Sequence, residues 1–244
     1  MTKEEPSREE AVVIFEESWK ELVEEYSEAR KLSTFCSEAD VELHLAHKLL
    51  DKLPPQIVHI ELPVPLKIER FSSELFSLGR IKKVKYYKPD IAIMDPIELN
   101  LHLIAELKFT PIYWSYVQPL LASKKFLGEE EIEAVKGDLG RSIDDLRRTR
   151  QEIPSQRDIE KTYFGLDKRG RTTNVEKLIG ILNDFAMKEG QVVTGYLCVI
   201  DEYYPNIKDV LQKAIKKYNP PDQFKILAEH IPVYEDLKKI LEEL

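Results

Sequence analysis

Residues 88–109 read KPDIAIMDPIELNLHLIAELKF, and this stretch decides the fold that we expect. It holds two apolar segments, Asp90–Met94 and Leu101–Phe109, which are separated by the turn residues Asp95 and Pro96. Short apolar runs joined by turn residues of this kind are typical of a β-hairpin. We therefore predict two neighbouring antiparallel strands here.

The alternation of side chains along the second strand predicts one polar face and one apolar face. Glu106 and Lys108 point the same way as His102 and Ile104, whereas the residues between them are apolar enough to be core. A turn centred near residue 98 places Asp90 directly opposite Glu106. Directly opposed residues of antiparallel strands point to the same side, so two carboxylates and one ammonium should share a patch of sheet.

Two neighbouring carboxylates repel each other unless a cation lies between them or one of them is protonated. Oxygen ligands of this kind suit Mg²⁺ or Mn²⁺, which keep water molecules in their coordination shell. A bound divalent ion lowers the pKa of its water and neutralises phosphoryl charge. Lys108 would then position that water or stabilise the negative transition state.

The motif PD at Pro89-Asp90 and the motif ExK at Glu106-Leu107-Lys108 resemble those of the PD-(D/E)XK nuclease superfamily. The resemblance implies an α/β, restriction-endonuclease-like core in the order helix, three strands, helix, strand. It also implies that the two acids and the backbone carbonyl of Leu107 hold Mg²⁺ or Mn²⁺. The lysine would act on the attacking water.

A glutamate on the first core helix often completes the site in that family. Glu38 is our candidate, with Glu42 as the substitute, on a helix predicted over Glu38–Leu50 with Ser37 as its N-cap. Glu38 also has a purely structural interpretation, because an acid in the first turn favours the helix dipole.

Hydrophobic periodicity predicts further elements on both sides of the hairpin. They are a helix over Ser7–Lys31, a strand over Ile57–Leu66, helices over Glu129–Arg150 and Asn174–Lys188, a central strand over Gln191–Ile200, and short helices after Pro205. The expected division is an N-terminal accessory helix in residues 1–36, a nuclease-like core in 37–202 with an insertion at about 151–188, and a C-terminal helical extension in 203–244. Strands mixed with helices in this order indicate a mixed sheet flanked by helices.

The net charge of −8 does not favour a polyanionic partner, although binding depends on local patches. Basic residues do cluster locally, and we predict phosphate contacts by Lys88, Lys136 and Arg147. A solvated charged face is the competing interpretation. The expected partner is nucleic acid, with DNA favoured over RNA, and a homodimer or protein partner is a further expectation for the amphipathic N-terminal helix.

Several other classes of protein find no support in the sequence. No apolar run is long enough to span a membrane and the N-terminus is polar, so we expect a cytoplasmic protein. The two cysteines form no CxxC pair, and no P-loop, GxSxG or HExxH motif occurs. His44 and His47 lack an evident third ligand. The Lys- and Glu-rich composition resembles that of thermophile proteins.

The sequence therefore predicts a metal-dependent nuclease that hydrolyses phosphodiester bonds. Two alternatives remain open at this point. One is a catalytically inactive protein of the same fold that serves as a binding module, and the other is an unrelated α/β protein in which the hairpin is a coincidence.

Overall fold

The computed structural model describes residues 6–29, 37–65, 86–95, 100–111, 126, 128–149, 154–167, 169–188 and 190–243. In chain order its elements are α1 (Arg8–Ala29), α2 (Glu38–Lys52), the 3₁₀ turn η2 (Pro55–Ile57), β1 (Val58–Ile60), β2 (Val64–Pro65), β3 (Tyr86–Tyr87), β4 (Ile91–Met94), β5 (Leu101–Thr110), α5 (Glu129–Thr149), α6 (Gln156–Thr162), α7 (Asn174–Lys188), β6 (Thr194–Asp201), α8 (Ile207–Ile215), the 3₁₀ turn η3 (Lys216–Tyr218), β7 (Phe224–His230) and α9 (Tyr234–Glu243).

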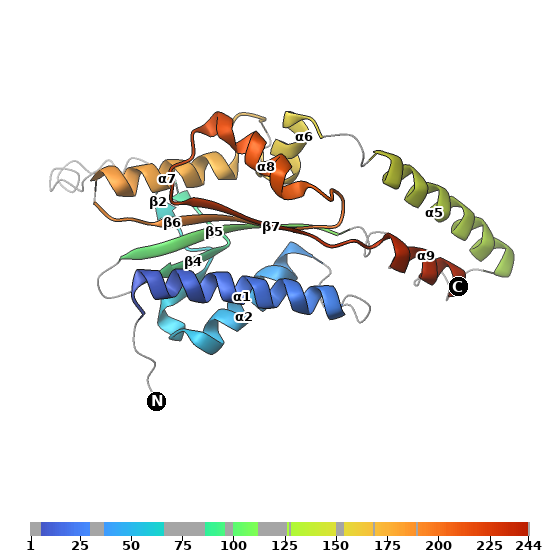
Figure 1. The fold of residues 1–244 in the computed structure, drawn as a ribbon, viewed down its shortest axis with the longest axis horizontal. Helices are drawn as coiled ribbons and strands as arrows, with labels where there is room; N and C mark the ends of the chain where they lie inside the picture. Colours follow the sequence, from blue (N-terminus) through green and yellow to red (C-terminus); the bar gives the residue numbers. More distant parts are fainter. Residues whose placement is uncertain are drawn as a thin grey trace, which may run out of the picture.

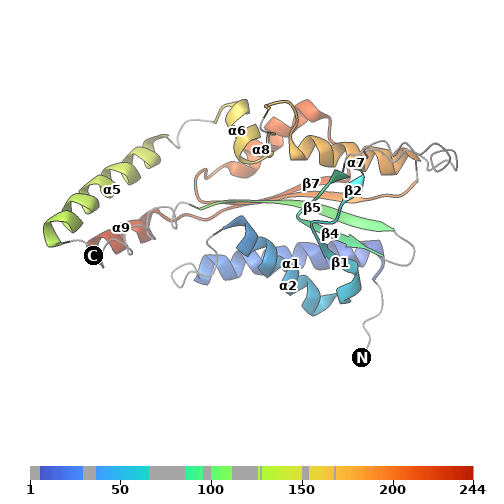
Figure 2. The same cartoon turned by 180° about the vertical axis from the view of Figure 1, so that it is seen from behind.

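Within the described residues, five strands form one mixed sheet in the order β1-β4-β5-β6-β7, with helices on both faces (Figures 1 and 2). The pairs β1–β4 and β4–β5 are antiparallel, whereas β5–β6 and β6–β7 are parallel. The short strands β2 and β3 pair separately. The expected mixed α/β architecture with a sheet flanked by helices is therefore present.

The central hairpin has the predicted register. Ile91 lies opposite Ala105 and Ile93 lies opposite Leu103, as a turn centred near residue 98 requires. The register shifts after Ile93, where the chain approaches the turn. The N–H of Asp95 donates to the carbonyl of Asn100 at 2.9 Å and closes the hairpin.

Helices α1 and α2 cover one face of the sheet (Figure 2). Phe15 and Leu22 of α1 and Leu45 of α2 are fully buried in one apolar cluster with Leu103 and Leu107 of β5. Burial of a side chain of this size contributes about 1.5–3 kcal/mol. The N-terminal helix is thus part of the main core, and its description as an accessory helix is wrong because its apolar stripe packs on the sheet.

Helix α7 covers the other face, together with α6 and α8 (Figure 1). Leu178 and Leu182 pack with Ile104 of β5, and a Cβ atom on Gly195 would lie only 2.6 Å from a methyl group of Leu182. Glycine at this position therefore allows the helix to approach the sheet closely. The segment expected to be an insertion, residues 151–188, supplies this layer through α6 and α7.

Helix α5 forms where it was predicted, but it does not cover the sheet. Figures 1 and 2 place it beside α9, beyond one end of the strands. The predicted division of the chain placed the helix over Glu129–Arg150 inside the nuclease-like core, before the insertion, and this placement is wrong because the helix packs on α9 instead of the sheet. Its periodic apolar stripe indicates an amphipathic helix but does not determine which neighbour covers that stripe.

The C-terminal segment is not wholly helical, contrary to the prediction. Residues Phe224–His230 form β7, which pairs with β6 and places β6 between two parallel neighbours. All eight residues of β6 are buried, as expected for a central strand. Within the described residues, no helix is long and apolar enough to cross a membrane.

Candidate functional site

The site lies at a step in the sheet, where β5 continues beyond the start of β4. Strand β4 begins at Ile91, opposite Ala105, whereas β5 runs on to Thr110. The N–H of Leu107 therefore finds a side-chain acceptor, Oδ2 of Asp90, at 2.6 Å. Asp90, the predicted first acid, therefore contacts the backbone of Leu107, the residue between Glu106 and Lys108.

The ammonium of Lys108 lies among three oxygens. Its Nζ is 2.6 Å from the carbonyl oxygen of Leu107, 2.9 Å from Oε1 of Glu38 and 3.1 Å from Oε1 of Glu106. The side chain is only 11% exposed. Burial lowers the pKa of Lys108, but the carboxylates of Glu106, Glu38 and Asp90 outweigh it and raise the pKa above its usual value. This lysine is therefore cationic near neutral pH.

The Glu106 carboxylate is 1% exposed, and both of its oxygens are hydrogen-bonded. Oε2 accepts the hydroxyl of Tyr87, and Oε1 accepts the side-chain amide of Asn174 at 2.6 Å. Burial and the neighbouring carboxylate hold the pKa of Tyr87 well above its usual value, so this phenol stays protonated as a donor. A buried carboxylate needs such partners to offset its lost hydration.

The pKa of Asp90 lies well above its usual value. Burial, followed by the charge of Glu106, raises the pKa of Asp90 to about 7. The N–H of Leu107 and the ammonium of Lys108 act in the opposite direction but do not cancel that effect. Asp90 therefore changes charge near neutral pH, which is the behaviour expected of close carboxylates without enough compensating positive charge.

Glu42 lies one turn after Glu38 on α2 and adds to the negative charge. Its Oε1 is buried and has no hydrogen-bond partner among the described residues. Burial, together with the charges of Glu61 and Glu38, raises the pKa of Glu42. Both glutamates considered for the first core helix thus belong to the same electrostatic group, but only Glu38 contacts Lys108.

Sequence reasoning missed Tyr87 and Asn174, which contact Glu106 from distant parts of the chain. Asn174 is the first residue of α7, and the hydroxyl oxygen of Thr173 accepts the N–H of Glu176 as an N-cap does. The TTN sequence at residues 172–174 marks this helix start. No local signal, however, indicates that the helix start meets β5.

Gly165 permits this approach of α7 to Glu106. Its φ is +64°, and a Cβ atom there would lie 2.9 Å from Nδ2 of Asn174. The carbonyl oxygens of Phe164 and Gly165 both accept the N–H of Asn174, at 2.8 and 3.1 Å. The loop before α7 is therefore packed against the amide that holds Glu106.

The residues predicted to contact nucleic acid lie in separate parts of the chain, and the two whose side chains the structure describes pair with acidic residues. Lys88 is 57% exposed and lies 3.6 Å from Glu61, while Lys136 on α5 pairs with Glu133 at 3.0 Å. Arg147 belongs to α5, and its side chain lies outside the described residues. The basic residues at 80–85 and the aromatic residues at 113–116 also lie outside the described part of the chain.

A second buried acid, Asp201, serves the architecture at the end of β6. Its Oδ1 accepts the hydroxyls of Tyr163, at 2.7 Å, and Thr110, and its Oδ2 accepts the N–H groups of Tyr203 and Tyr204. Four donors satisfy this carboxylate, so it anchors the turn that follows β6. It therefore differs from Glu42, whose buried Oε1 has no hydrogen-bond partner among the described residues.

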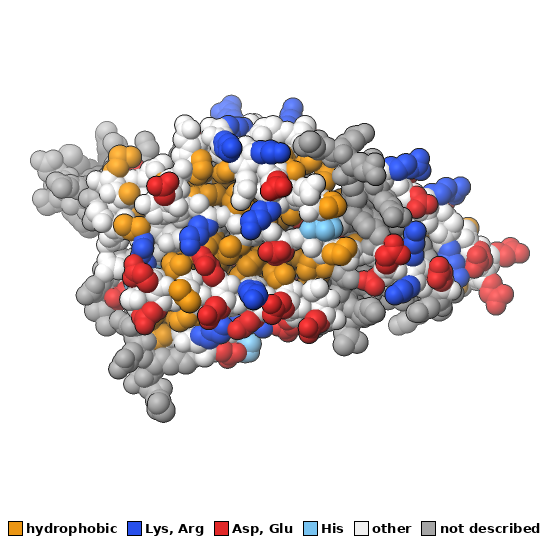
Figure 3. All heavy atoms as spheres, viewed as in Figure 1, with side chains coloured by type: hydrophobic (Ala, Val, Ile, Leu, Met, Phe, Trp, Pro, Cys, Tyr) orange, Lys and Arg blue, Asp and Glu red, His pale blue; other side chains and the backbone are white. Residues whose placement is uncertain are grey.

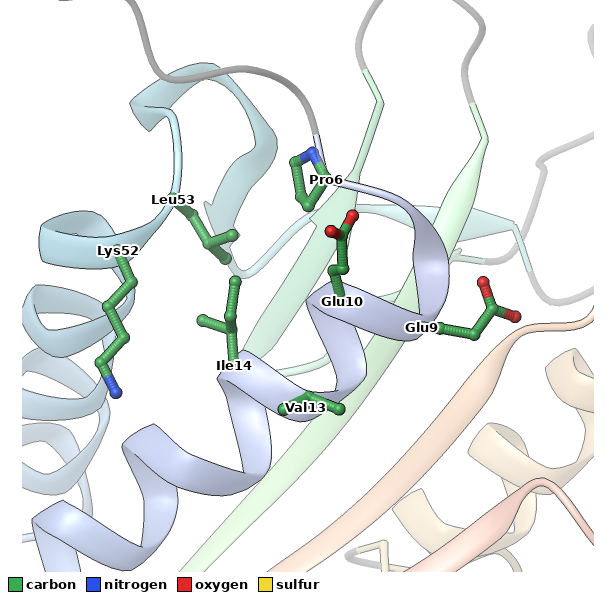
Figure 4. A pocket seen from close by; sticks show the side chains of 7 residues that line it. All are labelled: Pro6, Glu9, Glu10, Val13, Ile14, Lys52 and Leu53. Carbon is green, nitrogen blue, oxygen red and sulfur yellow. The ribbon is translucent and has the colours of Figure 1, made fainter.

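A surface hollow of about 420 Å³ lies away from the carboxylate cluster, between the start of α1 and the end of α2 (Figure 4). It is lined by Pro6, Glu9, Glu10, Val13, Ile14, Lys52 and Leu53. None of these residues belongs to the cluster, so the hollow does not extend the candidate site.

The donor types at the step fit a hard divalent cation. Asp90, Glu106 and the carbonyl of Leu107 supply only oxygen, and Mg²⁺ commonly takes one or two carboxylates and completes its shell with water. Within the described residues, no three Asp, Glu, His or Cys side chains converge as a ready-made metal cage. The donor atoms are therefore of the type that Mg²⁺ prefers, but a bound ion would need water or substrate oxygens as further ligands.

Comparisons with known proteins found no match. No family model fits this chain, and no curated protein or solved structure is significantly similar to it. The geometry at the step in the sheet therefore carries the functional proposal.

Proposed function

We propose that this protein is a metal-dependent nuclease of the PD-(D/E)XK type that hydrolyses phosphodiester bonds in DNA or RNA. The observation that carries the proposal is the convergence of Asp90, Glu106, Lys108 and the Leu107 backbone at the step in the sheet. A helix, three antiparallel strands, a helical layer and a parallel strand follow in order along the chain, which supports a restriction-endonuclease-like core.

In this proposal, Asp90, Glu106 and the carbonyl of Leu107 hold Mg²⁺ or Mn²⁺. When bound, such an ion neutralises charge on the phosphoryl group and acidifies its water. Because burial raises the pKa of Asp90 to about 7, Asp90 must lose its proton before it binds a cation. Tyr87 and Asn174 orient Glu106 so that its carboxylate is fixed before the substrate arrives.

Lys108 supplies the positive charge that the chemistry requires. Glu38 holds the ammonium at 2.9 Å, beside the Leu107 carbonyl and Glu106. From there Lys108 orients the attacking water and stabilises the negative charge that develops on the phosphoryl oxygens. Glu38 acts through Lys108, so it is a positioning residue rather than a catalytic one.

A second candidate function is that of an inactive nuclease-fold protein that binds a partner. The enclosure of Glu106 favours this reading, because both carboxylate oxygens already have donors and the side chain is 1% exposed. The net charge of −8 also favours the inactive binding protein, since it repels a polyanionic substrate.

Titration with Mn²⁺ by calorimetry tests the proposal, using the wild type, Asp90→Asn and Glu106→Gln at pH 8. We expect saturable binding in the wild type and its loss in both variants, followed by cleavage assays on DNA and RNA with the same proteins. Asp209→Asn is the matched control, because Asp209 is exposed on α8. A folded wild type that binds no Mn²⁺, with or without DNA, contradicts the nuclease and favours the binding module.

A further inference from the structure

Strand β7 forms an open edge of the main sheet. It pairs with β6 along one side, and no described strand pairs with its other side. Figure 1 places β7 in front, between α1 and α8, and Figure 3 shows apolar and charged side chains side by side across the middle of that face. An accessible edge strand is a template on which another strand can add.

The backbone groups of β7 that face away from the sheet can be identified from its hydrogen bonds. The Gln223 carbonyl and the Ile231 N–H both bond to β6, so the odd-numbered residues direct their backbone groups inward. Ile226 and Ala228 therefore direct theirs outward. In the described part of the chain, these outward groups have no partner.

The side chains of β7 that point toward α1 carry opposite charges in a symmetric arrangement. Lys225 and Glu229 are exposed and lie two residues on either side of Leu227, on the same face of the strand. Lys225 bonds to Oε1 of Glu16 at 2.7 Å, whereas no described residue pairs with Glu229. The acid is therefore available to a second molecule.

We propose that β7 pairs antiparallel with β7 of a second copy of this chain, with Leu227 on the two-fold axis. In this register Ile226 lies opposite the partner's Ala228, and their outward N–H and C=O groups bond to each other. Lys225 lies opposite the partner's Glu229, and the symmetry produces that pair twice. The two sheets then join into one continuous sheet.

Charge complementarity selects this register over its neighbours. A two-fold axis at Ile226 also pairs the outward backbone groups, but it places Lys225 opposite the partner's Leu227. An axis at Ala228 places Glu229 opposite that same leucine. Only the register centred on Leu227 puts opposite charges directly across from each other, an arrangement that stabilises antiparallel pairs.

Sedimentation velocity over a range of protein concentrations tests the proposal with charge reversals. We expect a reversible dimer whose dissociation constant rises by roughly tenfold in Glu229→Lys or Lys225→Glu, because like charges then face each other twice. The double variant Lys225→Glu/Glu229→Lys should restore the wild-type value. Glu130→Lys on the distant α5 is the control and should leave it unchanged.

Disulfide trapping gives a second readout that does not depend on charge. Residues opposite each other at a non-hydrogen-bonded site have Cα atoms about 4.5 Å apart, which suits a disulfide. Leu227→Cys should therefore form a covalent dimer on oxidation, whereas Glu229→Cys and the wild type should not. A monomer at every concentration would overturn the proposal, as would a dimer whose dissociation constant changes in neither charge reversal. The charges of Lys225 and Glu229 would then serve to prevent aggregation at the sheet edge.

Discussion

At the residue scale, the geometry of the site follows from the period of two along a β-strand. The opposition of Asp90 and Glu106 was predictable because the hairpin turn sets which residues face each other. That Glu38 belongs to this site was a hypothesis based on family resemblance, and the structure places its Oε1 2.9 Å from Nζ of Lys108, a contact that the sequence did not predict. Tyr87 and Asn174 were not predictable, because their positions depend on packing between distant segments.

Asp90 should make the stability of the protein depend on pH. Its folded pKa of about 7 lies above the usual value, so the folded state keeps a proton that the unfolded chain releases near pH 4. The resulting stabilisation is complete below pH 4 and is lost as the pH rises to 7, at up to about 1.4 kcal/mol per pH unit.

Urea unfolding of the wild type and Asp90→Asn in EDTA measures this effect. We expect Asp90→Asn to gain stability relative to the wild type between pH 5 and pH 8, because asparagine still accepts the N–H of Leu107 but has no charge to bury. Parallel stability curves for the two proteins would show that Asp90 does not titrate in this window.

Lys108→Met should separate metal binding from catalysis. The ammonium shares the oxygens of Glu106 and Leu107, so its removal should tighten Mn²⁺ binding by roughly tenfold, as loss of one neighbouring positive charge implies. Cleavage should fall by roughly a hundredfold or more, because the group that acts on the attacking water is missing. Calorimetry and single-turnover cleavage measure the two effects, with Lys48→Met on α2 as the control. Unchanged cleavage would remove Lys108 from the mechanism.

At the element scale, the positions of helices and strands along the chain were more predictable than the elements against which they pack. Helix α5 has the periodic stripe of a core helix, but α7 occupies that place, because only tertiary packing decides which apolar stripe meets the sheet. Strand β7 was missed because its alternating pattern is short and lies between prolines. Its pairing with β6 and its packing against α8 outweigh that weak local signal.

The loop before α7 offers a test of how this helix start supports Glu106. Gly165 and Gly170 both have positive φ, but only at Gly165 would a Cβ atom collide with Asn174. Gly170→Ala should cost about 1 kcal/mol, from its backbone conformation alone. Gly165→Ala should cost roughly 1 kcal/mol more and should also weaken Mn²⁺ binding, since it displaces the amide that holds Glu106.

Chemical denaturation and Mn²⁺ titration of both glycine variants provide the comparison. The two substitutions have the same backbone requirement, so the difference between them isolates the contact with Asn174. Equal stabilities and equal Mn²⁺ affinities would mean that the position of Asn174 does not control Glu106.

At the scale of the whole molecule, the main sheet packs between its two helical layers, and the α5–α9 pair lies beyond one end of the strands (Figure 1). The expected three-part division of the chain did not anticipate this arrangement. Helix α1 and strand β7 come from the two ends of the chain, yet both complete the core around β5 and β6. Sequence order alone does not reveal such contacts between remote segments.

Two truncations should distinguish the sheet and its helical layers from the α5–α9 appendage. A chain ending at Val233 lacks α9 but keeps β7, so we expect the sheet to fold and unfold cooperatively, with a melting temperature within a few degrees of the wild type. A chain ending at Tyr218 also lacks β7, which exposes one edge of the fully buried β6 and removes the cover from the α8 face. That chain should be insoluble or lack a cooperative transition in thermal denaturation followed by circular dichroism. If it folds as well as the longer chain, β7 is the appendage and the core ends at β6.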